Sequence, residues 1–298
     1  MILVAGGTGR VGGEVVRLLT GRGLAVRILS RDPDRSPGRS WQSVEVVAGD
    51  VRDPASLGRA VAGVSTVVST ITGFAPGEPG PQVIDDEGNR ALIRAARTSG
   101  AEHFVLVSIA GASPTHQLEI RRAKHQAEEE LRGSGLAWTI VRPTVLMETW
   151  AMVVGDPIRK GSRARVFGRG DNPVNFVSAD DVAGFVARAV LDPALRGVVL
   201  TVGGPENLTL NQVVSLCQET CARTGSTSHV PLPLLRLASV VVPRLKPDVG
   251  RLIEAAVDMD TSDMSFDSGE LERRFPDARL TRFAEVARRD LLRESVPA

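Results

Sequence analysis

The residues Gly6–Gly12 place glycines at a three-residue spacing, in the sequence GGTGRVG. A short apolar run, Ile2–Ala5, precedes them and predicts a buried strand, and the pattern that follows predicts an amphipathic helix. In this setting Gly6 permits a tight turn, Gly9 lets backbone N–H groups approach a pyrophosphate, and Gly12 lets the helix pack closely on the strand. The helix N-terminus then meets the phosphate charge, so the loop predicts dinucleotide binding.

The end of the second expected strand bears on the choice between NAD and NADP. An NAD site usually carries an acid about 20 residues beyond the loop, bonded to the ribose 2′-OH. Here the strand ends in Ser30 and Arg31, and the loop itself contributes Arg10. Two guanidinium groups suit a 2′-phosphate. Asp32 argues for NAD, but it precedes Pro33 and is more typical of a turn. We expect NADP(H).

Further cofactor contacts are expected where the strands end. Asp50 follows the strand expected at Val44–Ala48. Its carboxylate could accept a hydrogen bond from the adenine amino group, or it could serve only to form a turn. The residues expected to contact the cofactor are Gly6, Thr8, Gly9, Arg10, Val11, Gly12, Arg31, Asp50, Val51, Thr70, Lys124 and Pro143.

Apolar runs alternate with helical patterns over the first 200 residues, and several of the runs are nearly continuously β-branched. The expected strands are Ile2–Ala5, Ala25–Leu29, Val44–Ala48, Thr66–Ser69, His103–Val107, Thr139–Val141 and Val198–Val202. The expected helices are Val11–Thr20, Pro54–Val61, Val83–Ser99, Gln117–Arg132 and Asp181–Leu191. This alternation predicts an α/β fold, a doubly wound parallel sheet of the Rossmann type.

Domain organisation is expected to be simple. Residues 1–298 are expected to form a single NAD(P)-binding domain, in which 205–298 make mostly a small helical C-terminal substrate lobe. Two segments predict loops, Arg31–Ser40 and Gly73–Pro81, the latter with the sequence GFAPGEPGP. Because ligands of open α/β sheets bind outside the carboxyl ends of strands, the second loop is placed to border a site; a plain surface turn is the alternative.

Several segments together resemble a known superfamily. They are GGTGRVG, ILSRD, GDV, GNRALIRAARTSGAEHFVLVSIAGA and AKHQAEEELRGSGLAWTIVRPT, with NFVSADDVA and GGPENLTL further along. Over residues 1–215 the chain resembles the short-chain dehydrogenases/reductases, and within them the atypical NmrA-like and quinone-oxidoreductase-like branch.

The resemblance implies a catalytic Tyr-x-x-x-Lys motif and a serine at the end of the fifth strand. Lys124 matches the lysine and Ser108 the serine. The tyrosine would be residue 120, which is Ile120, and the chain contains no tyrosine at all. The usual proton donor is therefore missing.

Three residues are the candidates for catalysis. Lys124 could bond the nicotinamide ribose and stabilise a developing oxyanion, or form a solvated helix pair with Glu128. Ser108 could donate a hydrogen bond to the substrate, or it could simply be the residue at which a strand ends. His116 could act as general acid, or be an ordinary loop histidine.

The resemblance also implies a substrate side. Pro143, within Arg142-Pro143-Thr144, corresponds to the segment that contacts the nicotinamide carboxamide. Leu146, Met147 and Trp150 follow at helical spacing and could line a substrate pocket or belong to the core.

The composition limits which kinds of binding partner are expected. With 36 Lys+Arg against 35 Asp+Glu, the net charge of +1 gives no reason to expect nucleic acid or a membrane surface. Cys217 and Cys221 share one helix face and are expected to pack a core rather than to bind metal. The opening strand leaves no room for a signal peptide, so a cytoplasmic location is expected. The expected partner is a small-molecule substrate; the oligomeric state stays open.

Three functions remain in competition. The first is an NADPH-dependent oxidoreductase that reduces a small activated acceptor, a quinone, carbonyl, enone or imine, without the usual tyrosine. The second is an NADP(H)-binding redox sensor or regulator without catalysis, which the missing tyrosine motivates. The third is an isomerase or epimerase that recycles bound cofactor.

Overall fold

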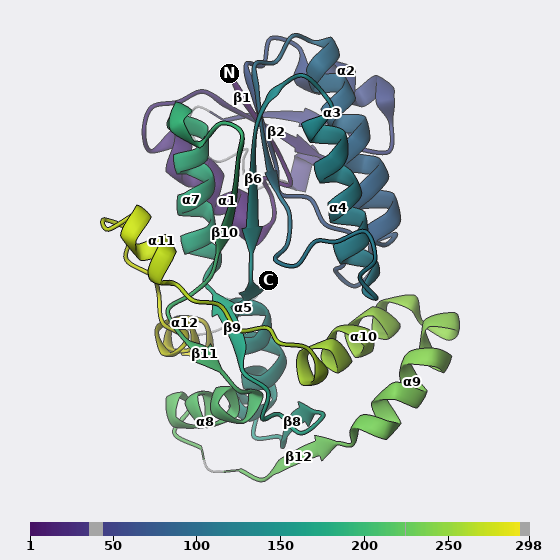
Figure 1. The fold of residues 1–298 in the computed structure, drawn as a ribbon, viewed down its shortest axis with the longest axis vertical. Coiled ribbons are helices and arrows are strands. Elements are labelled where there is room, and N and C mark those ends of the chain that lie inside the picture. Colours follow the sequence, from purple (N-terminus) through teal and green to yellow (C-terminus); the bar gives the residue numbers. More distant parts are fainter. Residues whose placement is uncertain (36–43, 224, 293–298) are drawn as a thin grey trace. The chain divides into compact units, whose positions relative to one another are not determined.

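The structure is a computed structural model that describes residues 1–35, 44–223 and 225–292. Its chain forms two compact units (Figure 1). The first comprises Met1–Pro143 and Val182–Thr201, and the second Thr144–Asp181 and Val202–Ala298. The second unit is thus not confined to the lobe expected at 205–298, because residues 144–181 also belong to it.

A seven-stranded sheet organises the first unit, in the order β10-β6-β5-β4-β1-β2-β3. Its strands are β1 (Ile2–Ala5), β2 (Val26–Ser30), β3 (Val44–Ala48), β4 (Thr66–Ser69), β5 (His103–Val107), β6 (Ala137–Pro143) and β10 (Val198–Val202). The five neighbouring pairs from β3 to β6 are parallel. The predicted doubly wound sheet is confirmed, and its strand order reverses between β1 and β4, where such sheets bind ligands.

Helices cover both faces of this sheet (Figure 1). They are α1 (Arg10–Thr20), α2 (Pro54–Val61), α3 (Asn89–Thr98), α4 (Glu119–Arg132) and α7 (Ala179–Leu191), with a π-helical turn η3 (Gln82–Gly88) before α3 and 3-10 turns η1 (Pro33–Arg35) and η5 (Pro193–Leu195). Helices α2, α3 and α4 pack Leu57, Leu92 and Leu131 on one face, against buried strand residues such as Leu3 and Phe104. The continuous apolar runs are explained by this double cover.

The second unit has its own core and small sheets. Its strands are β7 (Val145–Leu146), β8 (Ala164–Phe167), β9 (Val174–Val177), β11 (Asn207–Leu208) and β12 (Thr227–Val230), ordered β11-β9-β7 and β12-β8. Its helices are α5 (Met147–Trp150), η4 (Ala151–Gly155), α6 (Asp156–Arg159), α8 (Leu210–Thr220), α9 (Leu232–Leu245), α10 (Pro247–Thr261), α11 (Gly269–Arg274) and α12 (Phe283–Leu291). The rings of Phe176 and Phe283 pack edge to face in its core, with their centroids 5.6 Å apart.

The two cysteines belong to this second unit and both are free thiols. Cys217 is fully buried in the core, and burial raises its pKa to about 12. Cys221 packs partly against the same core. The structure thus supports the packing role expected for them. In the part of the chain that is described, no helix is both long and apolar enough to cross a bilayer.

Candidate functional site

The turn between β1 and α1 depends on its glycines. Gly6 has φ +84°, and a Cβ there would lie 2.5 Å from Thr70 Oγ1. A Cβ on Gly12 would lie 2.1 Å from the carbonyl oxygen of Gly6. Gly9 donates its N–H to that same oxygen at 2.9 Å. The turn therefore has the tight bend and the close helix–strand approach that the sequence predicts for Gly6 and Gly12.

The first turn of α1 is open to an anion. Gly9 is its N-cap residue, and among the described residues no side chain caps this end and no acid lies in the first turn. Thr8, Gly9 and Arg10 are exposed, and Val11 is half-buried. Uncapped N–H groups at a helix N-terminus favour a phosphate, so the backbone here fits a pyrophosphate. Thr70, just after β4, donates to Ala5 O at 3.1 Å and lies against the turn.

Arg31 lies at the end of β2 and already has a carboxylate partner. Its Nη1 and Nη2 donate to the two carboxylate oxygens of Glu78, at 2.8 and 2.6 Å. Glu78 belongs to the loop Gly73–Pro81, so this loop does reach one of the predicted cofactor residues. After Arg31 the chain bends into η1, as the turn expected at Asp32 requires. Of the loop expected at Arg31–Ser40, residues 36–40 lie outside the described part.

Asp50, after β3, forms a turn. Its Oδ1 accepts from the backbone N and Nε of Arg52, both at 2.9 Å, and its Oδ2 accepts from Nη2 at 2.6 Å. Hydrogen bonding from Arg52 lowers the pKa of Asp50. The turn-forming alternative is what the structure shows, and a contact with adenine stays a prediction. Val51 is buried, and a Cβ on Gly88 would lie 2.8 Å from its Cγ2.

Lys124 is buried and contacts three oxygen atoms of the protein. Its Nζ lies 3.0 Å from Asp85 Oδ1 and donates to Ile71 O at 2.9 Å and Val107 O at 3.0 Å. Only 4% of its side chain is exposed, and none of that of Asp85. An ammonium group has three protons; two are donated to these carbonyl oxygens, and Asp85 Oδ1 faces the group as an ion-pair partner without a hydrogen bond. The solvated helix pair with Glu128 is not formed.

Asp85 is the residue that sequence reasoning missed. It lies on η3, and its other oxygen accepts from Gly73 N at 2.7 Å. A carboxylate on the buried face of an expected helix was the available signal, since such a group needs a cation or several donors.

Ser108 has a buried acceptor. Its Oγ donates to Glu128 Oε1 at 2.5 Å. Glu128 is fully buried and also accepts from Arg142 Nε at 2.8 Å and Arg132 Nη2 at 3.0 Å. Nearby, Pro143 O accepts from Ala110 N at 2.8 Å. The serine lies at the end of β5 as predicted, but its proton points to a carboxylate of its own protein.

His116 lies in the segment before α4, between two donors. Its Nδ1 accepts from Leu118 N at 3.0 Å, and its Nε2 lies 2.7 Å from Arg121 Nη1. A neutral imidazole has one lone pair and a protonated ring has none. The neutral ring already carries one proton, which lies on Nε2 beside Arg121 when Nδ1 accepts from Leu118 N, so these two contacts decide nothing about a role as general acid. Its catalytic role stays a prediction.

Three residues expected on the substrate side, Leu146, Met147 and Trp150, lie within the second unit. Met147 is fully buried in the core, and Trp150 packs partly against it. The core alternative is what the structure shows for Met147 and in part for Trp150, whereas Leu146, on β7, is half-buried and lies outside this core cluster. Glu148 is also buried, and its carboxylate accepts from Ala179 N and from Arg289 Nη2.

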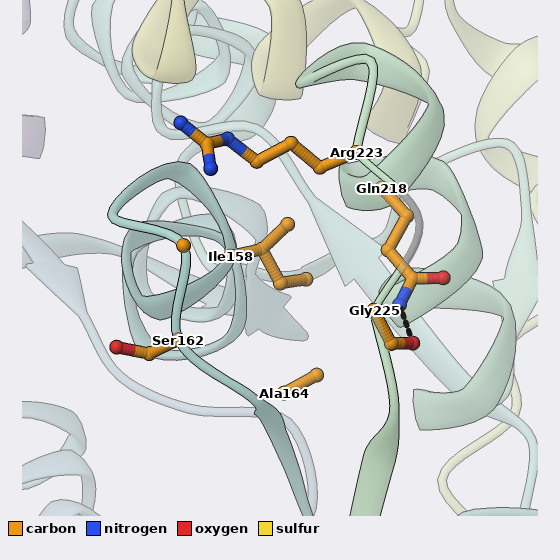
Figure 2. Close-up of a pocket in the computed structure, with 7 residues that line it drawn as sticks. Ile158, Ser162, Ala164, Gln218, Arg223 and Gly225 are labelled. Atoms are coloured by element: carbon orange, nitrogen blue, oxygen red, sulfur yellow. Dashed lines mark hydrogen bonds between the residues drawn. The ribbon is translucent and has the colours of Figure 1, made fainter.

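A small pocket also lies in the second unit (Figure 2). It measures about 150 Å³ and is lined by Ile158, Gly161, Ser162, Ala164, Gln218, Arg223 and Gly225. The Gln218 amide donates to Gly225 O at 2.8 Å, drawn as the dashed line. Ligand pockets usually measure ~300–1,000 Å³, and none of the predicted cofactor residues lines this one. It is not the dinucleotide site. No cluster of three metal-ligating side chains occurs in the described ranges.

Taken together, a glycine turn, an open helix N-terminus and a strand-order reversal beside it define a dinucleotide-binding Rossmann protein. Residues 6–193 match the family model described as NAD(P)H-binding, which covers more than half of the chain. The chain belongs to this NAD(P)H-binding family, which agrees with the resemblance found in the sequence.

Individual relatives agree with this assignment. The chain is 32% identical to the NAD(P)H azoreductase of Xenophilus azovorans over 75% of its own length and 74% of that protein. It is 38% identical to a (4-alkanoyl-5-oxo-2,5-dihydrofuran-3-yl)methyl phosphate reductase of Streptomyces griseus, over 71% of each. A solved structure of the NADPH-dependent quinone oxidoreductase of Escherichia coli with NADPH has the same fold (TM-score 0.79, 21% identity, 96% and 98% of the chains covered).

Proposed function

We propose that this chain is an NADPH-dependent oxidoreductase that reduces a small activated acceptor without a catalytic tyrosine. The observation that carries the proposal is the Gly6–Gly12 turn, open to a pyrophosphate, in a chain whose residue 120 is isoleucine. The bound cofactor would supply a hydride from C4 of its nicotinamide. The acceptor gains the hydride and one proton, and that proton is drawn from water.

The nature of the acceptor follows from the missing acid. Lys124 and Ser108 have internal partners, and His116 lies between two donors. A substrate that stabilises its own negative charge needs no strong acid at the moment of hydride transfer. Quinones, enones, imines and activated carbonyls have this property. The azoreductase relative adds azo compounds to this class.

The roles of the chain's residues follow their positions. The turn would hold the pyrophosphate through backbone N–H groups, and Arg31 with Arg10 would hold the 2′-phosphate. Lys124 would keep a positive charge beside the nicotinamide ribose, and Pro143 would border the carboxamide. Ser108 would donate to the substrate in exchange for its bond to Glu128.

The test is NADPH oxidation against quinones, azo dyes, enones, imines and simple aldehydes, for the wild-type chain and for Ile120→Tyr. We expect the wild type to reduce the activated acceptors and to leave aldehydes nearly untouched. A phenol at position 120 would restore a proton donor, so Ile120→Tyr should raise aldehyde turnover by about tenfold or more. Ile120→Phe, which adds the ring without the hydroxyl, is the matched control.

Two results would contradict the proposal. Measurable NADPH binding without turnover of any acceptor would favour a protein that senses NADP(H). Equal reduction of aldehydes and quinones by the wild-type chain would show that another group supplies the proton.

A further inference from the structure

Four charged side chains lie close together near the ends of β2 and β3, with one of them contributed by the loop after β4. Arg31 pairs with Glu78 and Arg52 pairs with Asp50. The two pairs also influence each other, since the charge of Asp50 raises the pKa of Arg31 and that of Arg52 lowers it. Each of these two pairs joins one cation to one anion, and one of the cations is the expected 2′-phosphate ligand.

The contact with Glu78 is well formed. The guanidinium and the carboxylate are bidentate, with N–O distances of 2.8 and 2.6 Å. The planar fork of an arginine grips a carboxylate and a phosphate in the same way. Glu78 therefore occupies an edge of Arg31 that a phosphate could use, and its charge repels any phosphate that approaches the remaining edge.

The loop that carries Glu78 is fixed at its base. Gly73 N donates to buried Asp85, and a Cβ on Gly73 would lie 2.2 Å from Gly80 O. Ile84 N donates to that same oxygen at 3.1 Å. At the tip, Gly77 has φ +80°, and Glu78 N donates to Ala75 O at 3.2 Å. The carboxylate is thus held toward Arg31 by a short closed loop.

Exposure differs within the pair. The side chain of Arg31 is 58% exposed and that of Glu78 21%. A ligand can therefore reach the arginine from solvent, while the carboxylate stays partly covered.

We infer that Glu78 opposes the binding of a 2′-phosphate at Arg31 and so sets how strongly the site discriminates NADPH from NADH. The inference rests on the proposed function, because it assumes that the cofactor lies along β1 and β2. NADH has a hydroxyl in place of the phosphate and does not compete with a carboxylate for the arginine. The native pairing therefore weakens the binding of NADPH selectively and reduces the preference of the site for NADPH over NADH.

The test is direct titration of NADPH and of NADH into the full chain, followed by nicotinamide fluorescence at fixed ionic strength. For Glu78→Gln we expect the Kd of NADPH to fall about three- to fivefold, the size of a well-aligned exposed ion pair, and that of NADH to change less than twofold. Glu87→Gln removes the same charge from an exposed position on η3 and is the matched control. It should change both values less than twofold.

A second comparison assigns the effect to Arg31. In an Arg31→Ala background, Glu78→Gln should no longer tighten NADPH binding by more than about twofold. An unchanged or weaker affinity of Glu78→Gln for NADPH, or equal changes for both cofactors, would overturn the inference alone. Failure of the wild-type chain to bind either cofactor would overturn the proposed function.

Discussion

The two ends of the candidate site are built in different ways. At Gly6–Gly12 the ligand would meet backbone N–H groups. The turn is possible there because Gly6 and Gly12 have no Cβ atom. Around β5 and α4 the chemistry would depend on Lys124, Ser108 and His116, each of which contacts partners within the protein. The first end is ready for its ligand. The second end has to exchange internal contacts for contacts with a ligand.

This difference has a physical origin. Helix N-terminal N–H groups cannot be satisfied within the helix, so they stay open to an anion unless a side chain caps them. A buried ammonium or carboxylate, by contrast, is costly without partners, and folding supplies them. The residues of the family's catalytic motif thus stabilise the fold as well, and their contribution to stability can be measured apart from activity.

The largest expected effect comes from breaking the Lys124–Asp85 pair. Lys124→Met leaves the buried Asp85 carboxylate without its cation, and we expect the free energy of unfolding to fall by about 3–5 kcal/mol. Urea denaturation measures this loss. Adding Asp85→Asn to Lys124→Met removes the stranded charge and should restore much of the stability. A loss below about 0.5 kcal/mol in the single variant would mean that Lys124 is free for the cofactor after all.

A change at the glycine end should have a somewhat smaller effect on stability. Gly12→Ala places a Cβ 2.1 Å from Gly6 O, against backbone that cannot move aside easily. We expect a loss of about 2–3 kcal/mol and weaker NADPH binding, seen by thermal unfolding and by titration. Gly58→Ala on α2 is the control, because a Cβ at Gly58 meets nothing within 4 Å. Normal NADPH binding by Gly12→Ala would contradict the assignment of this turn.

The smallest expected effect on stability concerns His103, at the start of β5, opposite the end that carries Ser108. Burial, aided by Arg196, lowers the pKa of His103 to about 4 from 6.5. Because the unfolded chain binds more protons between these values, stability is full above about pH 6.5 and declines as the pH falls toward 4. We expect this histidine to account for a decline on the order of 2 kcal/mol.

Urea denaturation at pH 4.5 and 7.5 tests this expectation. His103→Gln should flatten the pH dependence, since a glutamine amide does not titrate. His229→Gln, at an exposed histidine, should leave it as in the wild type. An unchanged slope in His103→Gln would assign the decline to other groups.

Much of the first unit was predictable from the sequence. Strands β1, β3, β4, β5 and β10 have the expected bounds, because each is a short apolar run between turn residues. The glycine turn was predictable for the same local reason. The expected helix Val83–Ser99 is divided into η3 and α3, and a change in helical hydrogen bonding of this kind leaves no apolar periodicity to read.

The sequence by itself determined the doubly wound sheet, the dinucleotide turn and the loss of the tyrosine, since these follow from neighbours along the chain and from composition. Only the tertiary structure decided which charges meet. Lys124 and Asp85 are 39 positions apart, and Glu78 lies 47 positions from Arg31. Such pairs form because parallel strands bring their carboxyl ends to one edge of the sheet, and a single sequence carries no periodicity that records which side chains face each other there.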